Sequence, residues 1–82
     1  MTPQPDIIGI FVTNLRSLRQ ARGLTLAELA RLVGYSERYL EIIERGEVDP
    51  TINTMAELAA ALGVKATQLL APVLVKTTEP LA

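Results

Sequence analysis

The stretch that decides the fold is residues 26–45, LAELARLVGYSERYLEIIER. Its apolar residues recur at the spacing of a helix face, first on one side of a glycine and then on the other. They are Leu29 and Val33 before Gly34, and Leu40 and Ile43 after it. Because glycine adopts a positive φ without steric cost, Gly34 ends the first helix and begins a tight turn. The pattern predicts two short helices packed together across that turn, which is a helix-turn-helix.

Start and stop signals extend this pair to five helices. Polar N-caps precede four of them, and Thr25 also forms a capping box with Glu28. The N-caps are Asp6, Thr25, Ser36 and Thr51. A glycine or a proline follows each helix. The expected helical ranges are residues 7–22, 26–33, 37–45, 52–62 and 66–71.

These helices predict a compact all-α domain over residues 6–71, with short segments on either side. Residues 1–5 contain two prolines and are expected to form a flexible arm, and residues 72–82 an extended tail. The tail contains the apolar triplet 73–75, Val-Leu-Val. This triplet has three interpretations: pairing with a second copy in a dimer, folding back over the fifth helix, or a frayed end.

Composition excludes several function classes. The chain has 82 residues, of which 49% are hydrophobic, enough for one small domain with a marginal core. It has no cysteine and no histidine, so disulfides, zinc sites and the usual nucleophile–base pairs cannot be built. We therefore expect no metal, no cofactor and no enzymatic activity.

The charge is unevenly distributed along the chain. The net charge is −1, but residues 1–46 hold all six arginines against five acids. Residues 47–82 hold two lysines against four acids, so the more cationic half contains the helix-turn-helix. No apolar run approaches the roughly 20 residues of a membrane span. We expect a cytoplasmic protein without a membrane partner.

A helix-turn-helix lays its second helix in the major groove of DNA. Arg38 is the candidate for reading a base, since a guanidinium donates two hydrogen bonds to guanine O6 and N7. A solvated arginine paired with Glu41 fits the same position. Glu37 and Glu41 have the chemistry to accept from cytosine amino groups, and also to stay solvated. Both interpretations are open for Glu37, whereas Glu41 is expected to be solvated or to orient Arg38 by pairing with it.

Three further side chains have two interpretations each. Arg16 and Arg22 have the charge to contact phosphate from the first helix, and their spacing equally fits a solvated face. Tyr39 either packs against the core or donates its hydroxyl to a phosphate.

The segment GLTLAELARLVGYSERYLEIIERG, followed by DPTINTMAELAAALGV, resembles the Xre-type helix-turn-helix family. This family includes Cro-like phage repressors and restriction–modification controller proteins. The resemblance covers about residues 10–71. It implies a five-helix repressor-like domain, sequence-specific operator binding and a homodimer.

The resemblance also implies which positions face DNA: Thr25, Leu26, Ser36, Glu37, Arg38, Glu41, Ile42, Thr51 and Asn53. Residues 36–42 match the recognition helix, and the others match the starts of the helices before and after it. Arg19 and Glu44 match a family pair that links the first and third helices.

The function predicted by pattern and resemblance together is a sequence-specific transcriptional regulator. It would be a repressor that binds double-stranded DNA as a homodimer on a palindromic operator. The alternative is a protein-interaction module that kept the fold without binding DNA. Leu26 replaces the glutamine common in the family, and Ile42 replaces a residue that is often polar. With the two acids of the third helix, these departures favour the alternative.

Overall fold

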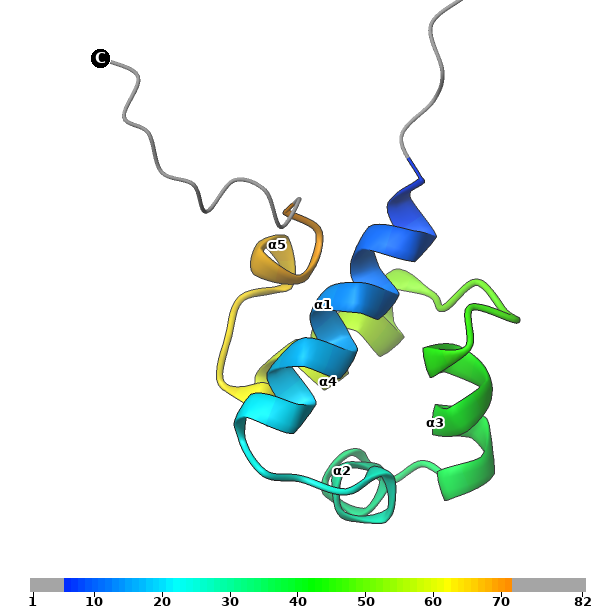
Figure 1. Ribbon diagram of the computed structural model, residues 1–82, viewed down its shortest axis with the longest axis vertical. Coiled ribbons are helices and arrows are strands. Elements are labelled where there is room, and N and C mark those ends of the chain that lie inside the picture. Colours follow the sequence, from blue (N-terminus) through cyan, green and yellow to red (C-terminus); the bar gives the residue numbers. More distant parts are fainter. Residues whose placement is uncertain (1–5, 72–82) are drawn as a thin grey trace, which may run out of the picture.

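The computed structural model describes residues 6–71, and these fold into five helices without a strand (Figure 1). They are α1 (Ile7–Ala21), α2 (Leu26–Val33), α3 (Glu37–Glu44), α4 (Ile52–Leu62) and α5 (Ala66–Leu69). The expected all-α class is confirmed. The predicted arm and tail, with the apolar triplet 73–75, lie outside the described residues. No helix within residues 6–71 has the length and hydrophobicity needed to cross a bilayer.

The helices surround one core, with α1 running through the middle of the molecule (Figure 1). Helix α4 lies behind α1 in this view, and α2 contacts both α3 and α4. Helix α3 lies at one edge of the molecule, and α5 lies on the opposite side of α1. The helix-turn-helix pair therefore occupies one end of the domain and leaves one side of α3 facing outward.

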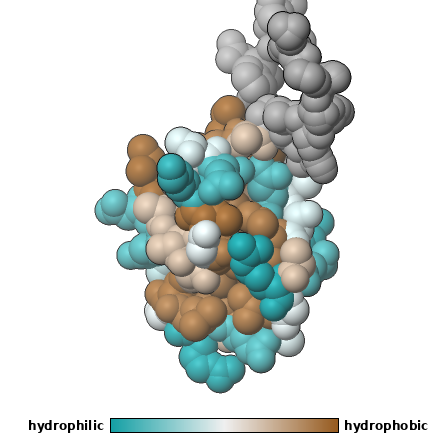
Figure 2. All heavy atoms as spheres, turned by 90° about the vertical axis from the view of Figure 1, so that its left-hand side faces the viewer, coloured by the Kyte–Doolittle hydropathy of each residue, from teal (hydrophilic) through white to brown (hydrophobic). Residues whose placement is uncertain are grey.

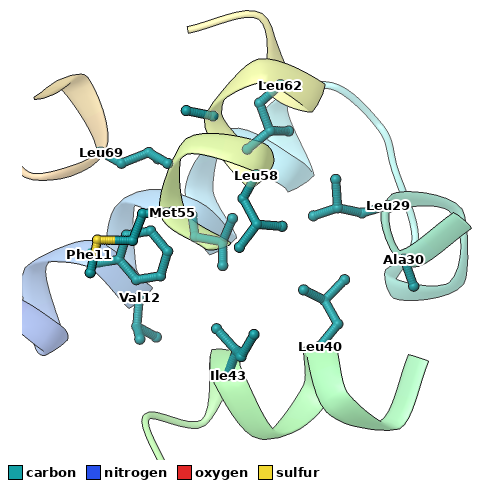
Figure 3. Packing of buried hydrophobic residues seen from close by; sticks show 12 residues of the cluster. Phe11, Val12, Leu29, Ala30, Leu40, Ile43, Met55, Leu58, Leu62 and Leu69 are labelled. Carbon is teal, nitrogen blue, oxygen red and sulfur yellow. The ribbon is translucent and has the colours of Figure 1, made fainter. Parts of the chain in front are cut away.

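All five helices contribute to the core, which is entirely apolar at its centre (Figure 3). The large side chains with less than 2% exposure are Phe11, Leu15, Leu29, Leu40, Ile43, Leu58, Leu62 and Leu69. Burying one such side chain contributes roughly 1.5–3 kcal/mol. Because α3 supplies two of them, its inner face is held firmly against the domain.

The caps predicted from the sequence are present. The Asp6 carboxylate accepts from the amide of Gly9 at 2.9 Å. A Cβ at Gly9 would come too close to that carboxylate, so any other residue here would require the Asp6 side chain to move, while glycine leaves room for it and lowers helix propensity. In α2, the Thr25 hydroxyl accepts from Glu28 N at 3.0 Å, and the Glu28 carboxylate accepts from Thr25 N at 2.8 Å. Helix α2 then ends at Gly34, whose φ is +79°.

Three helices end earlier than expected, and one of them is α3, which ends at Glu44 instead of residue 45. Helix α1 ends at Ala21, one residue short, where the backbone turns toward Gly23. Helix α5 ends at Leu69 instead of residue 71. The amide of Asn14 donates to the carbonyls of Leu69 at 2.9 Å and Ala71 at 2.7 Å. These bonds from α1 hold the end of α5 in a turn. Local helix propensity cannot predict this contact, because the residues are far apart in the sequence.

Candidate nucleic-acid interface

One side of α3 is buried and the other is open to solvent. Leu40 and Ile43 on the inner side are both 0% exposed. On the outer side, Glu37 and Arg38 are exposed, and Ile42 is half-buried at the border. No part of residues 6–71 covers this outer side. The first condition for a recognition helix, a rigid rod with an accessible polar face, is met.

Besides α1, three helices begin with an N-terminus that is capped by a hydroxyl and leaves backbone amides unused. The hydroxyls of Thr25, Ser36 and Thr51 each accept from the amide three residues on, at 3.0, 3.0 and 3.1 Å. The amides of the first helical residues point outward without an intrahelical partner. Together with the helix dipole, these amides favour an anion such as phosphate.

Arg19 and Glu44 join α1 to the end of α3. Arg19 Nε donates to Glu44 Oε2 at 2.7 Å, and Nη2 donates to Oε1 at 3.1 Å. The side chains are only 12% and 7% exposed. Arg19 Nη1 also donates to the carbonyl of Leu24 at 2.8 Å. One guanidinium therefore holds α1, the loop before α2 and the last turn of α3 together.

Arg16 has a role that neither of its two interpretations included. Its Nη2 donates to the carbonyl of Glu44 at 2.9 Å, and its Nε lies 3.9 Å from Glu44 Oε1. A cation at the C-terminus of a helix is favoured by the helix dipole. Arg16 therefore caps α3 with a side chain that is still half exposed, and Arg22, just after α1, is exposed.

The partner of Glu41 is Arg45. Arg45 Nη2 donates to Glu41 Oε2 at 2.8 Å, in the i, i+4 geometry of one helix face. The interpretation that paired Glu41 with Arg38 is wrong, because Glu41 pairs with the cation four residues after it, the favoured order of acid and base along a helix. Within residues 6–71, Arg38 forms no ion pair, so its guanidinium is available.

The other predicted positions differ in how far they are exposed. Leu26 is half-buried and packs against the core, which explains why an apolar residue stands there. Thr51 and Asn53 are exposed at the start of α4. Ile52 between them is 81% exposed, an unusually open position for an isoleucine.

Tyr35, in the turn before α3, was missed as a site residue. Its hydroxyl donates to Glu57 of α4 and lies 3.2 Å from Thr54 Oγ1. The bond to the Glu57 carboxylate is the main cause that raises the pKa of Tyr35. Tyr39 packs on this ring edge to face, at 5.4 Å and 83° between ring planes, and stays 36% exposed. The sequence contained one signal for this contact. Packing at position 35 requires only an apolar side chain, but tyrosine adds a hydroxyl.

Two helices packed across a glycine turn, the second with a buried inner face and an open polar outer face, define the protein as a helix-turn-helix domain. The sequence profile of the family described as "Helix-turn-helix domain" matches residues 10–71. The chain belongs to the Xre-like branch of this family, the helix-turn-helix transcriptional regulators that bind DNA.

Similar proteins cover nearly the whole domain. An uncharacterized HTH-type transcriptional regulator, y4dJ of Sinorhizobium fredii, is 43% identical over 67 residues, which is 82% of this chain and 87% of the relative. The crystal structure of a hypothetical transcription factor from Neisseria, NHTF, superposes with a TM-score of 0.84 at 30% identity, covering 94% of both chains. The restriction–modification controller protein C.AhdI of Aeromonas hydrophila superposes at 0.72 with 34% identity, over 76% of this chain and 94% of that one.

Proposed function

We propose that this chain is a repressor that binds a palindromic operator as a homodimer and blocks access of the polymerase. The observation that carries the proposal is the outer side of α3, which is open and presents Arg38 without an ionic partner among the described residues 6–71. The family resemblance gives the direction of approach, with α3 lying along the major groove.

Base choice in this proposal comes from the first two turns of α3. Arg38 donates to guanine O6 and N7, and Glu37 accepts from a cytosine amino group. Ile42 offers an apolar contact of the kind that a thymine methyl accepts. Glu41 acts less directly, because its carboxylate is already paired with Arg45 at 2.8 Å.

Affinity comes mainly from phosphate contacts that do not depend on sequence. The open amides behind Thr25, Ser36 and Thr51 supply them, with the side chain of Asn53 beside the last. Because each contact releases counterions, binding is expected to weaken steeply with salt.

The homodimer is proposed to form on the side of α5, opposite α3. Apolar atoms gather between polar groups on the face of the molecule that includes α5 (Figure 2). Val64 and Leu70 on either side of α5 are half-buried and border the core. A second copy related by a two-fold axis would place two α3 helices about one helical turn of DNA apart.

The alternative, a protein-interaction module without DNA binding, is favoured by the exposed carboxylate of Glu37 and the net charge of −1. The Glu41–Arg45 pair weakens this alternative, because it compensates one of the two acids on α3. The relatives named as transcriptional regulators support a role without catalysis.

Selection of bound sequences from a random duplex pool tests the proposal. We expect enrichment of two inverted half-sites about 10 base pairs apart, with guanine at one fixed position of each half. Single, unpaired sites would contradict the homodimer. A pool without enrichment would contradict sequence-specific binding and favour the interaction module.

A further inference from the structure

A row of four side chains connects the turn before α3 to the first turns of α4. Thr51 Oγ1 lies 3.1 Å from Thr54 Oγ1, which lies 3.2 Å from Tyr35 Oη. Tyr35 Oη in turn bonds to Glu57 Oε1. The row begins at the N-cap of α4 and ends at a carboxylate six residues further along the same helix, with the tyrosine of the α2–α3 turn between them.

The protons of this row run in one direction. Each hydroxyl has a single proton, and a carboxylate is a stronger acceptor than a hydroxyl. The Tyr35 proton therefore goes to Glu57, Thr54 donates to Tyr35, and Thr51 donates to Thr54. The pKa of Tyr35 agrees with this order, since the bond to Glu57 raises it and the bond to Thr54 opposes that rise.

In this order the hydroxyl protons of Thr51 and Ser36 have different partners, although both residues are N-caps. The proton of Thr51 is used inside the row, whereas Ser36 has no acceptor for its proton within residues 6–71. Thr54 at the centre is only 7% exposed, so the link passes through the interior instead of through solvent. The row therefore connects the start of α3 to the start of α4 by side-chain hydrogen bonds.

We propose that Tyr35 and Glu57 are positioning residues for DNA binding, which act through Thr54 to fix the start of α4 relative to the start of α3. Both starts would then meet neighbouring phosphates without further rearrangement. The inference rests on the proposed phosphate contacts of these two helix N-termini. It adds two residues that have no direct contact with DNA in the proposed complex.

The first test is Tyr35→Phe, which removes one hydroxyl and keeps the ring that packs on Tyr39. Binding to a random-sequence duplex at low salt is followed by fluorescence anisotropy, at a temperature where circular dichroism shows the variant folded. We expect DNA binding to be about fivefold to tenfold weaker, because the variant loses one hydrogen bond that holds the two helix starts in position before DNA binds. A folded variant that binds as tightly as the parent overturns the inference.

A second pair of variants separates positioning from charge. Glu57→Gln and Glu57→Ala remove the same negative charge, but only glutamine keeps an oxygen that accepts from Tyr35. We expect Glu57→Ala to bind more weakly than Glu57→Gln by a factor similar to that of Tyr35→Phe. Equal binding by the two variants contradicts the positioning role, even if Tyr35→Phe proves poorly folded.

The route through Thr54 is tested by a double-mutant cycle. Thr54→Val breaks the row at its centre but leaves the bond from Tyr35 to Glu57, so adding Tyr35→Phe to it should cause a smaller loss of DNA affinity than Tyr35→Phe causes in the parent. Additive losses would show that Tyr35 acts elsewhere. If the parent protein fails to bind the random duplex at low salt, the proposed function itself is refuted. If the parent binds and Tyr35→Phe binds equally well, only this inference is refuted.

Discussion

The Glu44 carboxylate accepts two hydrogen bonds from the Arg19 guanidinium, at 2.7 and 3.1 Å, across the interface between α1 and α3. Both side chains are largely removed from water. An ion pair in this environment is favourable only because both partners are present and well aligned. It fixes the C-terminal end of α3, while the core leucine and isoleucine fix its inner face.

Arg19→Ala is expected to destabilise the domain by roughly 3–5 kcal/mol, because it leaves the buried Glu44 carboxylate without its main partner. Chemical denaturation and the melting temperature measure this loss. DNA binding should fall only in proportion to the unfolded fraction. Arg22→Ala, at the residue that directly follows α1, is the control, and as an exposed side chain it should change stability by less than about 0.5 kcal/mol. Unchanged melting of Arg19→Ala would reject a structural role for the pair.

Arg38→Ala is expected to weaken binding to the selected operator by about 1–3 kcal/mol and to relax the preference at one base position. Competition between operator variants measures both effects. Arg31→Ala on α2 removes the same charge from an exposed position outside the predicted DNA-facing set. If Arg38→Ala weakens all sequences uniformly, the side chain contacts phosphate and does not read a base.

Thr51→Ala is expected to cost about 1 kcal/mol of stability through loss of the α4 cap. It should also weaken operator and random DNA by the same factor, because the helix start meets phosphate and not a base. Parallel titrations on the two duplexes test this equality. Thr13→Ala, an exposed threonine on α1, is the matched control. A loss confined to the operator would contradict a backbone contact at this helix start.

Stability is expected to fall on acidification through the α2 capping box. The pKa of Glu28 is lowered, first because its carboxylate accepts from the backbone of Thr25. A group with a lowered folded-state pKa stabilises the fold above its unfolded value of 4.5, and this contribution is lost as the pH falls through the folded value. Glu28→Gln keeps an acceptor but cannot titrate, so its stability should fall less between pH 5 and pH 3. Parallel curves for parent and variant would contradict this assignment.

Structural features that depend only on residues close together in the chain could be predicted from the sequence. The capping box of Thr25 and the glycine ends of α2 and α4 are formed as predicted. Each arises from residues within about one helical turn, so the local pattern contains all the necessary information.

Long-range contacts could not be predicted in the same way. The clamp of Asn14 on the end of α5 and the bond from Tyr35 to Glu57 join residues 55 and 22 positions apart. Arg16 is half exposed, in line with a solvated face, but its bond to the end of α3 was not predicted. Which polar side chains meet depends on how the amphipathic helices pack, and periodicity alone does not define that geometry.

The most direct measurement is a salt titration of binding to random-sequence duplex DNA by the purified chain. We expect micromolar binding at low salt, and the logarithm of the binding constant should fall linearly with the logarithm of the salt concentration, as for several phosphate contacts. Absence of binding at low salt, by a protein that is folded under the same conditions, would contradict the assignment of the outer side of α3 to DNA.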